Sequence, residues 1–247
     1  MRDADVVTFH ENYRGVSVEA DGSALWTAVG NSAAFDADCG CVVEDAGFGD
    51  SVVELTPSLD PVDSARPVDV PREGDDDFGA APVLFDVPGC GPYAAVNNKD
   101  GYLYVWRRDR LDAGPVAEFG IGTPTGPFVG QPSWSARENV LYDASTNVVD
   151  GDESAGDGVS AIAFSNACNV LVRWQAVTGV GTQPPPLVLG EVVFAAGGSS
   201  GWTALDARTG DVLWQHASDS PTLAPPIAAD GRVYAGDFGG TLHAFAP

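Results

Sequence analysis

Lysine is nearly missing from this sequence of 247 residues, since Lys99 is the only one. Twelve lysine and arginine residues stand against 35 aspartate and glutamate residues, which makes the formal net charge −23. A chain this acidic repels phosphate groups, which argues against nucleic acid and against an anionic membrane surface as partners. We favour a solvated acidic shell, for which a high-salt habitat is one cause, over an acidic face built for a cationic partner.

Long apolar runs and helical periodicity are also lacking. No apolar run reaches membrane-spanning length, and residues 1–7 have no signal-peptide core, so we expect a processed chain or a gene start further upstream. No stretch places its apolar residues at helical spacing. The sequence has 30 Gly, 18 Pro and 11 Phe, which suits short strands joined by many turns. We therefore predict a single all-β domain over residues 1–247, with no membrane insertion.

Cysteine is sparse, with four residues at Cys39, Cys41, Cys90 and Cys168. Cys39 and Cys41 are spaced like half of a metal site, but no second cysteine pair or nearby histidine completes a zinc ligand set. An even number of cysteines allows disulfides, and we expect bridges or buried thiols rather than metal ligation. The sequence alone leaves the pairing open.

What the sequence does contain is a repeat with a period of 40 residues. Pro186 corresponds to Pro226, Val193-Phe194 to Val233-Tyr234, and Ala204-Leu205 to Ala244-Phe245. Strand-rich units of this length are typical of propeller blades, and they must stack because one small sheet cannot bury both faces. We expect turns at the glycines, and we expect Trp214 to pack between neighbouring sheets.

Weaker copies of the unit extend the pattern toward the N-terminus. We predict a β-propeller of four-stranded antiparallel blades, about five of them, at approximately 14–60, 80–115, 130–175, 185–216 and 225–247. The last unit lacks an outer strand. Either residues 5–10 supply that strand and close a five-bladed ring, or the chain is the C-terminal part of a seven- or eight-bladed ring.

Three segments interrupt the repeat. Residues 31–49 are interpreted as an irregular insertion, and residues 56–78, rich in Pro and Asp, as a long loop. Residues 150–157 resemble a calcium loop only faintly, because Ala155 stands where such a loop needs glycine. A surface hairpin is the better prediction for that segment.

The Ala-Leu-Asp-Ala-x-Thr-Gly-x-x-Leu-Trp pattern of residues 204–214 resembles the PQQ-enzyme repeat of quinoprotein dehydrogenases and related propellers. The resemblance is close over residues 186–216 and good over residues 226–246. It implies a PQQ-type β-propeller that works outside the cytoplasm. It identifies a fold rather than an activity, because assembly-factor propellers share the same repeat.

Three short motifs follow the order of the dehydrogenase pattern. Gly30-Asn31 resembles the segment whose asparagine binds calcium. The Asp75-Asp76-Asp77-Phe78-Gly79 run resembles the segment with the catalytic aspartate, where register favours Asp77 and spacing favours Asp75. Asn98-Lys99-Asp100-Gly101 resembles the segment whose cation contacts the quinone.

The resemblance thus implies a role for each matched residue. Asn31 and Asp77 would be calcium ligands, since calcium prefers oxygen donors. Asp77 or Asp75 would be the catalytic base that takes the proton from an alcohol. Lys99 and Asn31 would lie beside the PQQ cofactor, where the lysine would stabilise negative charge.

Each candidate also has an ordinary structural interpretation. Gly-Asn is a common turn pair, a run of aspartates suits a solvated loop, and lysine is frequent in hairpins. The family's adjacent cysteine pair, floor tryptophan and acidic calcium ligand have no counterpart in this chain. Two hypotheses therefore compete: a dehydrogenase of alcohols or sugars that uses PQQ and Ca²⁺, and a non-catalytic propeller that binds a small molecule or a protein on its top face.

Overall fold

The computed structural model describes residues 15–30, 34–36, 41–43, 47–67, 77–122, 130–150, 153–178, 184–197 and 201–246. Regular structure in these ranges is almost entirely β-strand, with a single 3-10 turn, η1 (Leu111–Ala113). The same ranges contain no helix long and apolar enough to cross a membrane. The predicted all-β class is confirmed.

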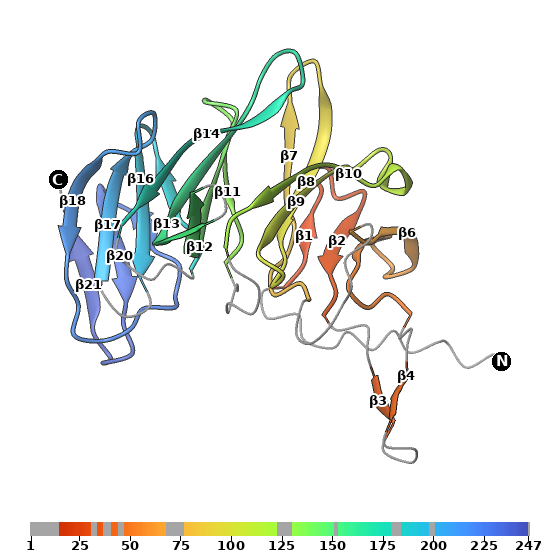
Figure 1. The fold of residues 1–247 in the computed structure, drawn as a ribbon, viewed down its shortest axis with the longest axis horizontal. Helices are drawn as coiled ribbons and strands as arrows, with labels where there is room; N and C mark the ends of the chain where they lie inside the picture. The colour runs from red at the N-terminus through yellow and green to blue at the C-terminus, as the bar shows by residue number, and fades with distance from the viewer. Residues whose placement is uncertain are drawn as a thin grey trace.

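Five antiparallel sheets follow one another along the chain, and within each sheet the strands lie in chain order (Figure 1). The first two sheets contain β1 (Ser17–Val18), β2 (Leu25–Ala28), β5 (Val52–Leu55) and β6 (Pro61–Ala65), then β7 (Val83–Val87), β8 (Gly91–Asn97), β9 (Tyr102–Arg107) and β10 (Pro115–Gly120). The third contains β11 (Ser133–Ser135), β12 (Val140–Asp150), β13 (Glu153–Phe164) and β14 (Val170–Val177). The last two contain β15 (Leu187–Leu189), β16 (Val192–Gly197), β17 (Gly201–Asp206) and β18 (Val212–His216), then β19 (Ile227–Ala229), β20 (Arg232–Gly236) and β21 (Leu242–Phe245).

Successive sheets pack face to face like the blades of a propeller. The first strands of neighbouring sheets contact one another, β1 with β7, β7 with β11, and β11 with β15. Most of the buried hydrophobic clusters combine side chains of two neighbouring sheets. Phe85 of the second sheet packs with Phe164 of the third, and Tyr142 of the third packs with Leu205 of the fourth. The propeller architecture predicted from the repeat is therefore present in the structure.

The turns of the repeat have the conformations that their residues favour. Gly210 has a φ of 78°, and Asp206 Oδ1 accepts hydrogen bonds from the backbone N–H groups of Arg208 and Thr209. Trp214 stacks on Phe194 of its own sheet, with ring centroids 5.8 Å apart. It also meets Phe245 of the fifth sheet edge to face at 5.0 Å. The predicted position of Trp214 between two sheets is confirmed.

Two segments differ from the predictions. Residues 56–78 are not one long loop, because β6 forms the outer strand of the first sheet. That strand is largely solvent-facing and begins with Pro61, so its sequence lacks the apolar alternation of a core strand. The insertion at 31–49 is not wholly irregular either, because β3 (Ala34–Asp36) pairs with β4 (Cys41–Val43) in a separate two-stranded sheet that projects below the blades in Figure 1.

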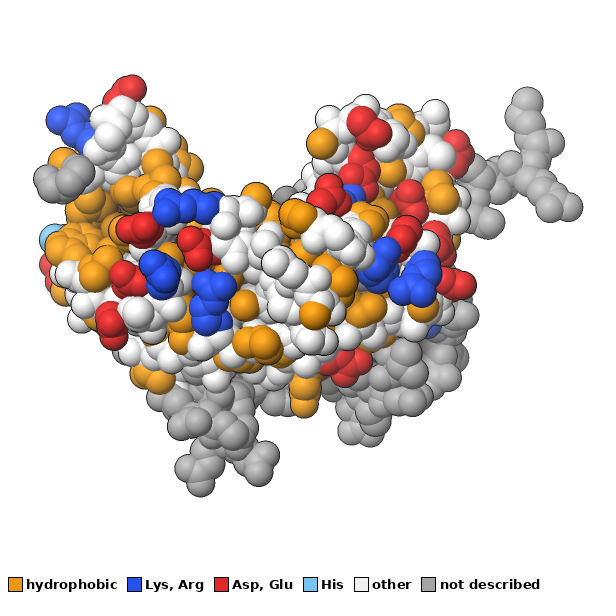
Figure 2. Space-filling view, turned by 90° about the horizontal axis from the view of Figure 1, so that it is seen from above, with side chains coloured by type: hydrophobic (Ala, Val, Ile, Leu, Met, Phe, Trp, Pro, Cys, Tyr) orange, Lys and Arg blue, Asp and Glu red, His pale blue; other side chains and the backbone are white. Residues whose placement is uncertain are grey.

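The acidic surface is not concentrated on the face seen in Figure 2. Acidic and basic side chains lie interspersed there, with hydrophobic side chains between them. The long hairpin of β12 and β13 pairs Asp150 with Glu153, which agrees with the predicted hairpin at residues 150–157. Residues 5–10, predicted to supply a closing strand, lie outside the described part of the chain.

Candidate functional site

Two of the predicted site residues come together at one end of the second sheet. Asp77 lies in the segment that leads into β7, and Lys99 lies in the hairpin between β8 and β9. The Nζ of Lys99 is 2.7 Å from Oδ1 of Asp77. The backbone N–H of Lys99 donates to the carbonyl oxygen of Asp77 at 2.8 Å. The two motifs are therefore joined through both side chain and backbone.

The hairpin that carries Lys99 is built by its neighbours. Asn98 Oδ1 accepts a hydrogen bond from the backbone N–H of Asp100 at 2.9 Å, and Gly101 takes a φ of 94°. Asp100 accepts hydrogen bonds from the backbone N–H of Tyr102 and from the Tyr104 hydroxyl, at 2.9 and 2.6 Å. Asparagine, aspartate and glycine favour such turns, so the sequence itself determines this local geometry.

The ion pair is deeply buried. The side chain of Asp77 is 1% exposed and that of Lys99 is 9% exposed. Phe78 forms an isolated bridge with Asn98 and packs its ring edge to face against Trp106, with centroids 6.2 Å apart. A buried lysine is costly unless it is paired, so the contact with Asp77 explains how the chain's only lysine can occupy this position.

The remaining predicted site residues, Asn31 and Asp75, lie outside the described residues. Across the part of the chain that is described, no group of three or more His, Cys, Asp or Glu side chains is arranged to hold a metal ion. Asp77 is the one proposed calcium ligand among these residues, and its Oδ1 contacts the Lys99 ammonium. The described donors therefore do not form a calcium site by themselves.

A second buried polar pair lies beside this hairpin and was not predicted. Asn97, the last residue of β8, donates through Nδ2 to Oδ1 of Asp143 in β12 at 2.6 Å. Asp143 is 1% exposed and Asn97 is 0% exposed. Burial raises the pKa of Asp143 to about 7, against the smaller lowering effect of hydrogen bonds from Asn97 and the Ala144 backbone. Comparison of equivalent repeat positions could have found the pair, because polar residues replace small or apolar ones there.

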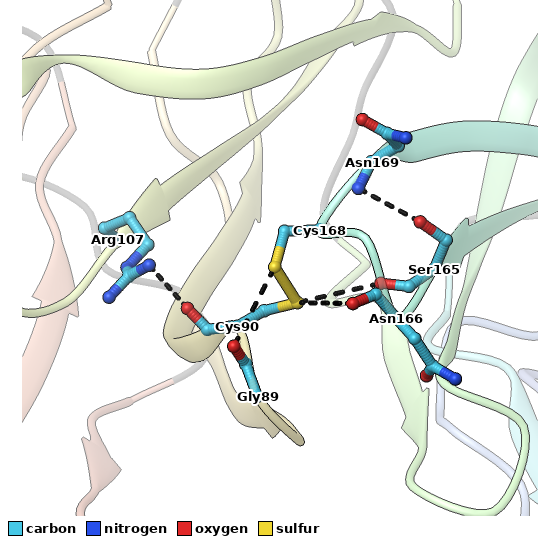
Figure 3. The surroundings of a disulfide bond; sticks show 7 residues. All are labelled: Gly89, Cys90, Arg107, Ser165, Asn166, Cys168 and Asn169. Carbon is cyan, nitrogen blue, oxygen red and sulfur yellow. Dashed lines mark hydrogen bonds between the residues drawn. A yellow bond between two sulfur atoms is a disulfide. The ribbon is translucent and has the colours of Figure 1, made fainter.

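A disulfide joins the second and third sheets at their opposite end, and it settles a cysteine pairing that the sequence alone does not determine. Cys90, in the turn after β7, is bonded to Cys168, in the turn after β13 (Figure 3). Arg107 Nη1 donates to the Cys90 carbonyl oxygen at 2.5 Å. Second and third sheets are thus fastened by a covalent bond at one end and by the Asn97–Asp143 contact toward the other.

The fold and its repeat define a class of protein, the β-propellers built from PQQ-type repeats. Residues 171–247 match a family model described as outer membrane protein assembly factor BamB. The structure is similar to BamB from Moraxella catarrhalis, with a TM-score of 0.59 and 17% identity over 94% of this chain and 73% of that protein. The chain has no significant match among curated protein sequences.

Quinoprotein dehydrogenases have similar structures. A europium-containing methanol dehydrogenase matches with a TM-score of 0.63 and 14% identity, over 90% of this chain and 50% of the enzyme. A quinohemoprotein alcohol dehydrogenase, ADHIIG from Pseudomonas putida HK5, matches with a TM-score of 0.60 and 15% identity, over 90% of this chain and 44% of the enzyme. The chain spans about half the length of these enzymes or less. These matches confirm the PQQ-repeat propeller fold that the repeat indicates.

Proposed function

We propose that this protein is a non-catalytic PQQ-type propeller that binds a protein or a small-molecule ligand outside the cytoplasm. The observation that carries the proposal is the closed state of the Asp77–Lys99 pair. A general base must reach the proton that it removes, whereas Asp77 is 1% exposed and lies 2.7 Å from the Lys99 ammonium. In this arrangement both side chains stabilise the hairpin rather than face a substrate.

A binding surface of suitable size lies elsewhere on the molecule. A cavity of about 890 Å³ opens between the fourth and fifth sheets, lined mainly by apolar side chains that include Phe194, Trp214 and Phe245. Trp214 is 37% exposed there. Concave apolar surfaces of this size, with aromatic walls, are typical ligand sites. The match of residues 171–247 to the assembly-factor family covers this region.

The location outside the cytoplasm is supported by the disulfide. Bridges such as Cys90–Cys168 persist in oxidising compartments and are rare where thiols are kept reduced. The acidic surface and the chain's single lysine are compatible with a soluble domain in such a compartment.

A second function, PQQ-dependent dehydrogenation of an alcohol or sugar, is favoured by one specific observation. The fold joins Asp77 to Lys99, the residues that the resemblance implies as base and quinone contact. PQQ would accept a hydride from the substrate if it were bound. Lys99 would stabilise the negative charge, and Asp77 would take a proton after separating from the lysine. Calcium would need Asn31 or other residues in addition to Asp77.

Titration with PQQ, with and without Ca²⁺, separates the two functions. We expect no saturable quenching of tryptophan fluorescence in the wild-type protein or in the Lys99→Ala variant. The Arg137→Ala variant serves as the control, because that side chain is 62% exposed and distant in sequence from the pair. Saturable binding that requires Ca²⁺, is kept by Arg137→Ala and is weakened at least about tenfold by Lys99→Ala would overturn the non-catalytic proposal.

The apolar cavity is tested independently with the dye bis-ANS. We expect Trp214→Ala to reduce dye binding several-fold, because the indole forms part of the cavity wall. Leu213→Ala is the matched control, since Leu213 neighbours Trp214 on β18, is 55% exposed and does not line the cavity. Equal dye binding in both variants would show that the cavity is not an accessible binding surface.

A further inference from the structure

The contact between Asn97 and Asp143 joins two sheets at a buried point. Asn97 ends β8 in the second sheet, and Asp143 lies in β12 of the third. Asn97 Nδ2 donates both to Asp143 Oδ1 at 2.6 Å and to the Gly130 carbonyl oxygen at 3.0 Å. Gly130 belongs to the segment that enters the third sheet. One amide group therefore connects the hairpin end of the second sheet to two places in the third.

The repeat shows that neither residue is needed to build a blade. In the second to fifth sheets, a proline precedes the first strand, and the residue after that proline pairs with a residue of the second strand. From the second sheet to the fifth, that partner is Ala95, Tyr142, Phe194 and Tyr234. Counting one residue onward from that position, Asp143 is matched by apolar residues, Val96, Ala195 and Ala235. Two residues onward, Asn97 is matched by Ala144, Ala196 and Gly236. Aligning Leu25-Trp26 with Leu141-Tyr142 adds Thr27 and Ala28 from the first sheet. Among these equivalent positions of the described strands, a carboxyl meets an amide only between the second and third sheets.

The ionised form of the Asp143 carboxyl group would have few hydrogen-bond donors around it. Its Oδ2, like the Oδ1 of Asn97, has no hydrogen-bond partner among the described residues. Burial raises the pKa of Asp143 to about 7, and the hydrogen bonds from Asn97 and the Ala144 backbone lower it by less. An unpaired carboxylate in this surrounding destabilises the closed contact, whereas the protonated form does not.

The charged groups around the pair do not supply a counter-ion. On the second sheet, Lys99 is paired with Asp77, and Asp100 accepts the Tyr104 hydroxyl proton. On β13 the residue opposite Asp143 is Ser160, which carries no charge. Among the described residues, no charged side chain contributes to the pKa shift of Asp143. The pKa of Asp143 therefore depends on whether the Asn97–Asp143 contact is buried or exposed to water.

Any opening of the contact affects the Lys99 hairpin directly. Asn97 is followed at once by Asn98 and Lys99, whose backbone N–H groups bond to Tyr102 and Asp77. We propose that Asn97 and Asp143 form a pH-sensitive latch that holds the Lys99 hairpin against the third sheet while Asp143 is protonated and releases it when Asp143 ionises. Release would loosen the hairpin and expose the buried Asp77–Lys99 pair. The latch goes beyond the proposed binding function and does not depend on it.

Hydrogen exchange of the hairpin amides tests the latch on the protein alone. The quantity to compare is the protection factor of Lys99 and Gly101, which corrects for the intrinsic pH dependence of exchange. We expect constant protection below about pH 4, a loss of up to about tenfold for each pH unit between about 4 and 7, and no further loss above about pH 7, because opening releases the Asp143 proton only within that window. The amides of Ala195 and Thr203, in the centre of the fourth sheet, should stay better protected than those of the hairpin at every pH, because they open only with the whole domain.

Two variants distinguish a latch from a merely structural contact. Asp143→Asn cannot ionise, so its hairpin should stay protected at every pH. Asn97→Ala removes a hydrogen bond that lowers the Asp143 pKa of the closed state, so its protection should go on falling to a pH above 7. Asp112→Asn, an exposed acid in η1, is the control. A loss between about pH 4 and 7 that persists in Asp143→Asn, or no loss over that range in the wild-type protein, would overturn the proposal. PQQ binding is not measured, so a failure of the latch is separate from a failure of the proposed function.

Discussion

The disulfide between Cys90 and Cys168 should be a major source of this protein's stability. The two cysteines are 78 positions apart and join the turns of neighbouring blades (Figure 3). Replacing both with alanine removes the cross-link from the unfolded chain. For a loop of this length, the chain-entropy relation gives a loss of about 4.5 kcal/mol in the free energy of unfolding at 25 °C. A loss of this size lowers the Tm of a domain of about 250 residues by roughly 9–18 °C.

The measurement is guanidinium unfolding of wild type and the Cys90→Ala/Cys168→Ala variant, followed by tryptophan fluorescence. Four of the six tryptophans, Trp26, Trp106, Trp134 and Trp174, lie in the first three sheets, so fluorescence reports on the blades that the bridge joins. Mutation is preferable to chemical reduction, which would also affect any thiol chemistry at Cys39 and Cys41. The Cys39→Ala/Cys41→Ala variant is the control, because it leaves the cross-link between the blades intact.

The result that would refute this reasoning is a loss below about 1 kcal/mol in the Cys90→Ala/Cys168→Ala variant. Such a result would mean that contacts between the second and third sheets persist in the unfolded chain, so that the covalent bond restricts it little further. A smaller denaturant slope without a change in stability would point instead to a more compact unfolded chain.

Three further predictions concern packing and charge. Gly201→Ala should lower the free energy of unfolding, measured by denaturant titration, by more than about 3 kcal/mol, because the new Cβ would lie 2.0 Å from the His216 carbonyl oxygen. Gly190→Ala is the control: this glycine also has a positive φ but open space around it, so the substitution should cost only about 1 kcal/mol. The raised pKa of Asp143, about 7 when folded against 3.8, means that the folded state holds its proton more tightly, so wild-type stability should fall as the pH rises from about 4 to 7. The total loss is of the order of 4 kcal/mol, and Asp143→Asn, measured by the same unfolding titration, should lack this pH dependence. The net charge of −23 should make the Tm rise when NaCl is raised from about 0.01 to 1 M, since the Debye length falls from about 30 to 3 Å; an unchanged Tm would show that self-repulsion is unimportant.

Much of the blade structure could be predicted because it depends on short-range patterns. The strand residues Val193-Phe194 and the turn residues Asp206 and Gly210 recur at a fixed spacing, and each has a local conformational preference that the fold uses. The outer strand β6 was missed for the same kind of reason. It is solvent-exposed at the sheet edge, so its residues are not selected for the alternation that marks a core strand.

The candidate site was only partly predictable. The turn chemistry of Asn98, Asp100 and Gly101 indicates a hairpin, which the structure bears out. The motif resemblance implies roles for Asp77 and Lys99 but not the direct contact between them that the structure shows. Whether that pair is presented to a ligand or sealed inside the protein depends on the packing of Phe78 and Trp106 around it. The roles proposed for Asn31 and Asp75 stay predictions, since both lie outside the described residues.

The sequence by itself determined the class of this protein, because a 40-residue repeat with turn-forming residues at constant positions can bury its apolar faces only by stacking sheets. It also determined the hairpin around Lys99. The tertiary structure decided the contacts between segments that are distant in the chain: the bond between Cys90 and Cys168, the burial of Asp77 with Lys99, and the meeting of Asn97 with Asp143. Those contacts join residues 22 to 78 positions apart, and no local preference specifies them; they follow from how the sheets and their connecting segments pack together.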